Sequence, residues 1–183
     1  MISRPRVLGA VIAGGRARRF GSDKALAMLA GRPIIEHVIE ALRPQADEIV
    51  ICGRAWRKIP AIADRREGRI GPLAGLEAAL HYAKTADFQG VLSVPVDTLP
   101  LPRNLAAALV GDDPAVLRDQ HLIGYWPITC LGLLERHIED GGRSLGSWIG
   151  RAGARQIDGA AAMVNVNTPD DLRTLSAQEC SSA

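Results

Sequence analysis

The sequence predicts an α/β fold of three layers, in which helices cover both faces of a mostly parallel sheet, with an antiparallel portion in the C-terminal half. Two observations near the start of the chain carry this prediction. Residues 7–13 form a continuous apolar run that Gly14 and Gly15 end, which is typical of a strand buried on both faces. A helical pattern and a second apolar run follow by residue 52, and strand–helix–strand is the repeating unit of a parallel sheet.

The next elements follow from the spacing of apolar residues. Pro33 suits the first turn of a helix. Five apolar residues then recur on one helical face: Ile34, Ile35, Val38, Ile39 and Leu42. Glu48–Cys52 predicts a short strand, and a second apolar stripe predicts a helix over Gly75–Lys84. Gly90–Val96 then predicts a strand that ends at Asp97.

Prolines and a polar turn divide the following segment. Pro95 cannot donate to a strand ladder, so we place it at a bend or at a free N–H position near the strand end. Pro102 predicts the start of a short helix that runs to Leu109. Ala115–Arg118 and Ile123–Leu131 predict two strands, and the polar turn between them favours an antiparallel pair.

Capping residues mark the last two helices. Ser144 suits the N-cap of a helix over residues 145–152. Thr168 as N-cap, Pro169 at the first position and acidic residues at 170–171 all suit the start of the final helix. The tail of about 178–183 is polar, and we expect it to fray. Because no linker or repeat interrupts the pattern, residues 1–183 are predicted to form one domain.

Composition narrows the classes of protein. The 183 residues are 47% apolar, which is typical of a globular protein with a proper core, and the formal net charge of +2 gives no argument for nucleic-acid or membrane binding. Cys52, Cys130 and Cys180 are far apart and form no C-x-x-C pair, which indicates reduced thiols in the cytoplasm. No apolar run is long enough to span a bilayer. We therefore expect a cytoplasmic protein with neither nucleic-acid nor membrane partners.

The strongest local signal is the segment 12–24, where a buried strand delivers a pair of glycines, then three arginines, and finally Gly21 and Lys24. Glycines let backbone N–H groups approach phosphate oxygens, and arginine and lysine neutralise phosphate charge. A P-loop is excluded, because Gly21 lies six positions after Gly15 and Ala25 replaces the hydroxyl residue. The dinucleotide fingerprint G-x-G-x-x-G is also missing. A polar loop with solvated charges remains the alternative, but the density of cations favours phosphate binding.

This segment resembles the loop of the molybdenum cofactor guanylyltransferases, the MobA-like nucleotidyltransferases, which reads L-A-G-G-x-x-x-R-M-G-x-D-K. Seven residues match this pattern, namely Ala13, Gly14, Gly15, Arg19, Gly21, Asp23 and Lys24, whereas Ile12 and Phe20 are apolar substitutions. Three further blocks resemble the family in the same order: Gly71–Gly75, Val94–Thr98 and Asn165–Pro169. The resemblance covers nearly the whole chain.

The resemblance implies a Rossmann-like nucleotidyltransferase fold and an enzyme that transfers GMP from GTP to the phosphate of molybdopterin, with pyrophosphate as the other product. It implies catalytic roles for Lys24, Arg19 and Asp97, with Mg²⁺ on Asp97. The implied nucleotide-binding residues are Ile12, Ala13, Gly14, Gly15, Lys24, Asp64, Leu73, Ala74, Gly75 and Asp97. The implied residues for the pterin substrate are Arg19, Asn165 and Asn167. Other cofactor-synthesis proteins or acceptor enzymes are further possible partners.

Asp97 also stands out from its own position. It closes an apolar strand at the carboxyl edge, where parallel sheets place their ligands, and a carboxylate there can hold Mg²⁺. The alternative is an Asx-turn at the strand end. The chain departs from the family at two points: Leu99 lies between Thr98 and Pro100 where the family has D-T-P, and Cys52 takes the place of an asparagine that touches the nucleotide.

Several other polar and aromatic residues are candidates for the acceptor pocket, the core or the surface. Arg143 and Ser144 could border the acceptor pocket, whereas Trp148 lies on an apolar stripe and is assigned to the core. The four histidines are interpreted as surface or helix-face residues without metal-ligand spacing: His37, His81, His121 and His137.

Two alternative functions remain open at this point. The first is a sibling enzyme that uses CTP on molybdopterin or another small phosphate; its relatives carry L-A-A-G, whereas this chain has Ala13-Gly14-Gly15, which favours GTP. The second is a non-catalytic module that binds nucleotide or cofactor. The joint presence of Asp97 and Lys24 argues against it, because binding alone needs no aspartate placed for a metal.

Overall fold

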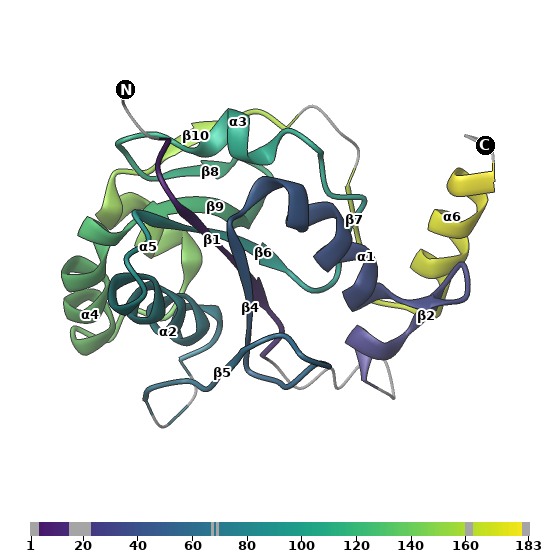
Figure 1. Cartoon of the computed structure of the whole chain (residues 1–183), viewed down its shortest axis with the longest axis horizontal. Coiled ribbons are helices and arrows are strands. Elements are labelled where there is room, and N and C mark those ends of the chain that lie inside the picture. Colours follow the sequence, from purple (N-terminus) through teal and green to yellow (C-terminus); the bar gives the residue numbers. More distant parts are fainter. Residues whose placement is uncertain (1–3, 15–22, 67, 69, 160–162, 181–183) are drawn as a thin grey trace.

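The computed structural model describes residues 4–14, 23–66, 68, 70–159 and 163–180 (Figure 1). Its centre is a seven-stranded sheet in the order β10-β8-β9-β6-β1-β4-β5. The strands are β1 Val7–Ile12, β4 Glu48–Cys52, β5 Ala61–Ile62, β6 Gly90–Pro95, β8 Ala115–Leu117, β9 Gln120–Pro127 and β10 Arg155–Ile157. Only β9 runs antiparallel to its neighbours in this sheet, β6 and β8. The predicted mostly parallel sheet with a C-terminal antiparallel portion is confirmed.

Helices cover both faces of this sheet. On one face lie α1 (Ile34–Leu42) and α3 (Leu105–Leu109), and on the other lie α2 (Pro72–Thr85), α4 (Leu131–Glu139) and α5 (Leu145–Ala152) (Figure 1). Alternation along β1 explains the two cores, because successive side chains point to opposite faces. Val7 and Val11 pack with α1, whereas Leu8, Ala10 and Ile12 pack with α2. The chain therefore has the three predicted layers.

Short elements beside the main sheet bring distant segments together. A 3-10 turn over Lys24–Leu26 precedes the ribbon of β2 (Met28–Leu29) and β3 (Arg32–Pro33). A second ribbon pairs β7 (Thr98–Leu99) with β11 (Val164–Asn165) in antiparallel fashion. The last helix, α6 (Pro169–Cys180), follows β11 and lies beside β2 (Figure 1). These contacts carry the C-terminal segment to the edge where β1 and β6 end.

Three predicted boundaries were wrong. The second helix begins at Pro72 instead of Gly75, because Gly71 adopts a left-handed φ of 73° and Pro72 then starts the helix. The third helix begins at Leu105 instead of Pro102. The fold supplies the reason: the buried amide of Gln45 donates to Pro102 O at 2.9 Å and accepts from Ala106 N at 3.1 Å. The strand predicted over 123–131 runs over Gln120–Pro127 instead, and a 3-10 turn over Ile128–Cys130 follows it. The final helix runs to Cys180, and the fraying of the tail of about 178–183 stays a prediction.

Other local predictions are confirmed. Ser144 caps α5, because its Oγ accepts from Ser147 N at 3.1 Å. Thr168 caps α6 by accepting from Asp171 N at 3.3 Å. Pro95 is the last residue of β6. Within the described residues, no helix is both long and apolar enough to cross a membrane.

Candidate functional site

The carboxyl ends of β1, β4 and β6 meet at one edge of the sheet and are tied together by backbone hydrogen bonds. Val96 N donates to Ile12 O at 3.2 Å, and Ala13 N donates to Cys52 O at 3.0 Å. Ile12 is buried, whereas Ala13 is half-buried and Gly14 exposed, so the chain rises from the core to the surface over three residues. The predicted phosphate loop therefore leaves the sheet at the expected edge. Gly15 and Arg19, both predicted site residues, lie outside the described residues.

Gly14 passes very close to Gly53, the residue after β4. Gly53 has φ +88°, and a Cβ placed on it would lie 2.6 Å from Gly14 Cα. Only glycine combines this backbone conformation with so close an approach. Gly53 was not among the residues predicted for the site, whereas the neighbouring Cys52 was considered for a nucleotide contact. The Cys52 side chain is buried between β4 and α2, and this burial, with the nearby charge of Asp64, raises the pKa of its thiol to about 12. Because the Cys52 side chain is buried, a nucleotide contact at this position would come from the backbone, which stays a prediction.

Lys24, Asp97 and Asn167 meet above this edge. Lys24 Nζ donates to Asp97 Oδ2 and to Asn167 Oδ1, each at 2.7 Å. The side chains of Lys24 and Asp97 keep 16% and 29% of their surface exposed, so the pair lies at the surface without being fully solvated. An ammonium group has three N–H donors, and the described residues engage two of them. Three residues predicted for one site thus lie in direct contact.

Asn165 belongs to the same cluster, but its side chain is engaged. Thr98 Oγ donates to Asn165 Oδ1 at 2.6 Å, and Val166 N donates to Asp97 O at 2.8 Å. Asp171 fixes the neighbouring backbone, since its carboxylate accepts from Asn167 N and Thr168 N, both at 2.7 Å. The Asn165–Asn167 segment is therefore held against the residues that follow β6.

Arg54 is a site residue that the sequence analysis missed. It follows Gly53, and its Nη1 donates to Asp23 Oδ1 at 2.7 Å, while Nη2 contacts the second carboxylate oxygen. The Arg54 guanidinium lowers the pKa of Asp23. Asp23 also accepts from Ala25 N at 3.2 Å, so it caps the 3-10 turn that begins at Lys24. Arg54 therefore positions Lys24 through Asp23.

Four other residues predicted to bind the nucleotide are not part of this polar cluster: three are buried in α2 and one is exposed. Leu73, Ala74 and Gly75 are buried in the first turn of α2, and a Cβ on Gly75 would lie 3.2 Å from Cys52 Cβ. Their side chains pack α2 on the strands, so any contact with a nucleotide must come from their backbone. Asp64 is exposed after β5. Nucleotide binding by these residues stays a prediction.

Three other residues considered from the sequence have different surroundings in the structure. Trp148 is fully buried, as predicted for a core residue. Arg143 Nη1 donates to Ile138 O and Gly142 O, each at 2.7 Å, so it closes the end of α4. His137 lies on α4, which fits the prediction of a surface or helix-face residue, but it is 5% exposed and packs against Trp148 at a ring-centroid distance of 5.6 Å.

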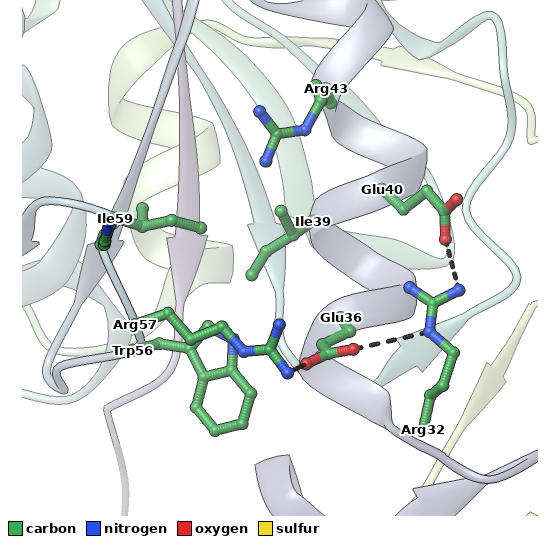
Figure 2. Close-up of a pocket in the computed structure, with 9 residues that line it drawn as sticks. Arg32, Glu36, Ile39, Glu40, Arg43, Trp56, Arg57 and Ile59 are labelled. Carbon is green, nitrogen blue, oxygen red and sulfur yellow. Dashed lines mark hydrogen bonds and ion pairs between the residues drawn. The ribbon is translucent and has the colours of Figure 1, made fainter.

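A separate hollow of about 960 Å³ lies between α1 and the segment 56–59 (Figure 2). Part of its charged rim is paired internally: Arg32 Nη1 contacts Glu40 at 2.8 Å, and Glu36 pairs with Arg32 and Arg57. Among the described residues, none that was predicted for the site lines this hollow. We therefore place the candidate site at the strand ends and not in the hollow of Figure 2.

Comparison with known proteins decides the family. Residues 9–157 match the MobA-like NTP transferase domain. The chain belongs to this family. A molybdenum cofactor guanylyltransferase of Acidiphilium cryptum is 35% identical over 185 residues, which cover 93% of this chain and 94% of the relative. A protein of the same name from Rhodobacter capsulatus is 32% identical over 178 residues, covering 91% and 93% of the two chains.

Solved structures agree with the fold. Molybdopterin-guanine dinucleotide biosynthesis protein A from Archaeoglobus fulgidus superposes with a TM-score of 0.76 at 25% identity, covering 96% of this chain and 100% of that one. The 2-C-methyl-D-erythritol 4-phosphate cytidylyltransferase of Thermus thermophilus gives a TM-score of 0.67 at 16% identity, covering 95% and 98%. The second likeness shows the fold alone. The predicted family and the Rossmann-like nucleotidyltransferase fold are confirmed.

Proposed function

We propose that this chain transfers GMP from GTP to molybdopterin, forming the guanine dinucleotide cofactor and releasing pyrophosphate. One observation carries the proposal: Lys24, Asp97 and Asn167 come from three distant parts of the sequence and meet at the carboxyl edge of the sheet. The chain also matches relatives named molybdenum cofactor guanylyltransferase, and each match covers more than nine-tenths of the relative. The enzyme is accordingly a nucleotidyltransferase.

The residues of the site divide the work of the reaction. Nucleotidyl transfer depends on positioning and on neutralising charge more than on covalent chemistry. The Lys24 ammonium has one donor unassigned among the described residues, and a phosphate oxygen of GTP would accept from it. Gly14 is exposed where β1 ends, and a glycine there lets backbone N–H groups approach phosphate oxygens. Arg19 would add a second cation, and Asn165 and Asn167 would face the acceptor.

The donor atoms around Asp97 fit a magnesium ion. Mg²⁺ takes oxygen ligands and is usually bound through one or two carboxylates together with substrate phosphates. Asp97 offers such a carboxylate, partly exposed at the strand end, and the amide oxygen of Asn167 shares its Lys24 partner. Asp97 would hold the ion, which would neutralise phosphate charge when bound. Until then Lys24 Nζ, which donates to Asp97 Oδ2 at 2.7 Å, holds the carboxylate in place.

The test is pyrophosphate release with Mg²⁺ and molybdopterin, in which GTP, CTP and ATP are compared and Asp97→Ala is run beside the parent. We expect release with GTP alone and its loss in Asp97→Ala, because a small neutral side chain cannot hold the ion. Release with CTP instead would show that Ala13-Gly14-Gly15 does not select guanine. Binding of GTP without any release would favour a nucleotide-binding module.

The setting of the reaction belongs to the same proposal. A cytoplasmic location suits the free, buried thiols of Cys52 and Cys130. Molybdopterin and GTP are the small-molecule partners, and cofactor-synthesis proteins or acceptor enzymes would deliver or receive the pterin. Retention of radiolabelled GMP on the protein without acceptor would contradict the direct transfer, which involves no covalent intermediate.

A further inference from the structure

A second cluster of ligating side chains lies between α2 and α4, on the side of the sheet opposite α1. Glu77 and His81 are four residues apart on α2 and therefore share a helix face. Glu135 on α4 completes the cluster, and one ligand atom from each residue lies within 4.8 Å of the others. The two helices pack side by side (Figure 1). The spacing of residues along the sequence does not reveal this cluster, because Glu135 lies on a different helix from Glu77 and His81.

Glu77 supplies the observation that points to a ligand. It is 1% exposed, and its Oε1 accepts from Arg66 Nε at 2.8 Å. Its other oxygen, Oε2, is buried and has no hydrogen-bond partner among the described residues. A buried carboxylate oxygen without a partner is costly, so its retention needs an explanation. A cation beside Oε2 would satisfy it.

The surroundings suit a divalent cation. His81 Nε2 lies 2.9 Å from Glu135 Oε1, and these side chains keep 26% and 34% of their surface exposed, which leaves a path for an ion and water. The two carboxylates carry two negative charges, which match a divalent cation. Arg66 bridges Glu77 Oε1 and Glu139 Oε1, the latter at 3.2 Å, and ligating carboxylates are usually oriented by such outer partners.

We infer that Glu77, His81 and Glu135 form a binding site for a divalent transition-metal ion of the zinc class. An imidazole with carboxylates favours Zn²⁺, Co²⁺ or Ni²⁺ over Mg²⁺, which takes oxygen ligands. Bonds of about 2.0–2.2 Å in a tetrahedral site place ligand atoms roughly 3.3–3.6 Å apart. The 2.9 Å contact of His81 and Glu135 would therefore open slightly around the ion, and any wider spacing within the 4.8 Å set would close. The ion would fasten α2 to α4. None of the three ligands belongs to the Lys24–Asp97 cluster, so the site stands independently of the proposed transferase reaction.

Zn²⁺ titration of the chelator-treated full chain tests the inference, with binding followed by calorimetry. We expect one saturable site per chain, and at least about tenfold weaker binding in His81→Ala and in Glu135→Gln, since even outer-shell losses cost that much. Two matched controls should bind like the parent: His121→Ala, which removes an exposed histidine on β9, and Asp97→Ala, which removes the proposed Mg²⁺ ligand.

Two further readouts separate metal binding from a plain His81–Glu135 contact. Co²⁺ should give visible d–d absorption in the parent that His81→Ala loses, and Zn²⁺ should raise the melting temperature of the parent but not that of His81→Ala. Circular dichroism of each variant verifies its fold. Equal Zn²⁺ affinity in the parent, His81→Ala and Glu135→Gln would overturn the inference, as would the lack of saturable binding in the parent.

Discussion

At the residue scale, the position of one ammonium group governs the candidate site. Lys24 Nζ lies 2.7 Å from both Asp97 Oδ2 and Asn167 Oδ1, and Asp23 holds the start of its 3-10 turn. Arg54 in turn holds Asp23. This chain of contacts places a cation at the strand ends before any substrate is present, which lowers the cost of organising the site during the reaction.

Lys24→Ala should lower guanylyl transfer by about 10²-fold or more, which is typical when one preorganised donor is removed from a transition state. The fold should remain, because a partly exposed lysine after a surface loop contributes little to the core. Lys58→Ala is the matched control, since Lys58 is exposed and lines the hollow of Figure 2. Steady-state pyrophosphate release and circular dichroism measure the two effects. Parent-like turnover in Lys24→Ala would remove its assigned role.

At the element scale, the backbones that follow β1 and β4 approach each other too closely for a side chain to fit between them. Gly53→Ala would place a Cβ 2.6 Å from Gly14 Cα at φ +88°. A left-handed alanine alone costs about 1–3 kcal/mol of unfolding free energy, and the clash adds to it. Urea unfolding should therefore show a clear loss of stability, together with reduced pyrophosphate release because the Gly14 backbone must move.

Gly146→Ala provides the control for this comparison. Gly146 lies in α5, and a Cβ there meets no atom within 4 Å. Alanine is the better helix former, so this change should stabilise the protein by roughly 0.5–1 kcal/mol. If both alanine variants had the same unfolding free energy as the parent, the close approach of Gly14 and Gly53 would be unimportant.

At the scale of the whole molecule, the three layers depend on two separate cores, and a buried histidine packs against one of them. His137 on α4 is buried against Trp148, and its Nε2 lies 3.2 Å from Ser147 Oγ. Burial lowers the pKa of His137, and the positive charges of Arg151 and Arg143 lower it further, against an opposing effect of Asp140. The folded state therefore favours the neutral ring.

This shift predicts how stability depends on pH. Because the folded pKa lies below the ordinary 6.5, the unfolded chain binds more protons as the pH falls through this range. His137 therefore contributes stability that is full above about pH 6.5 and is lost as the pH falls towards its folded pKa. The melting temperature of the parent should fall from pH 7 to pH 5.5 more steeply than that of His137→Gln. Equal slopes would contradict this assignment.

Local signals in the sequence were sufficient for most elements and for the position of Asp97. The apolar run of β1, the cap at Thr168 and the strand that leads to Asp97 depend on residues only a few positions apart. Hydrophobic burial and backbone hydrogen bonding act on any chain with that pattern, so a single sequence predicts them. The family resemblance added the roles of Lys24 and the two asparagines.

The remaining features of the site depend on contacts between residues that are far apart in the sequence. Lys24 and Asn167 are 143 residues apart in sequence, and their contact follows from the β7–β11 ribbon. Gln45 sets the start of α3 from 61 residues away, and the Glu77–His81 pair gains Glu135 only when α4 packs on α2. Such contacts depend on crossovers and on the register of distant strands, which spacing along the chain does not encode. The sequence therefore predicts which elements form, whereas tertiary packing determines which side chains meet.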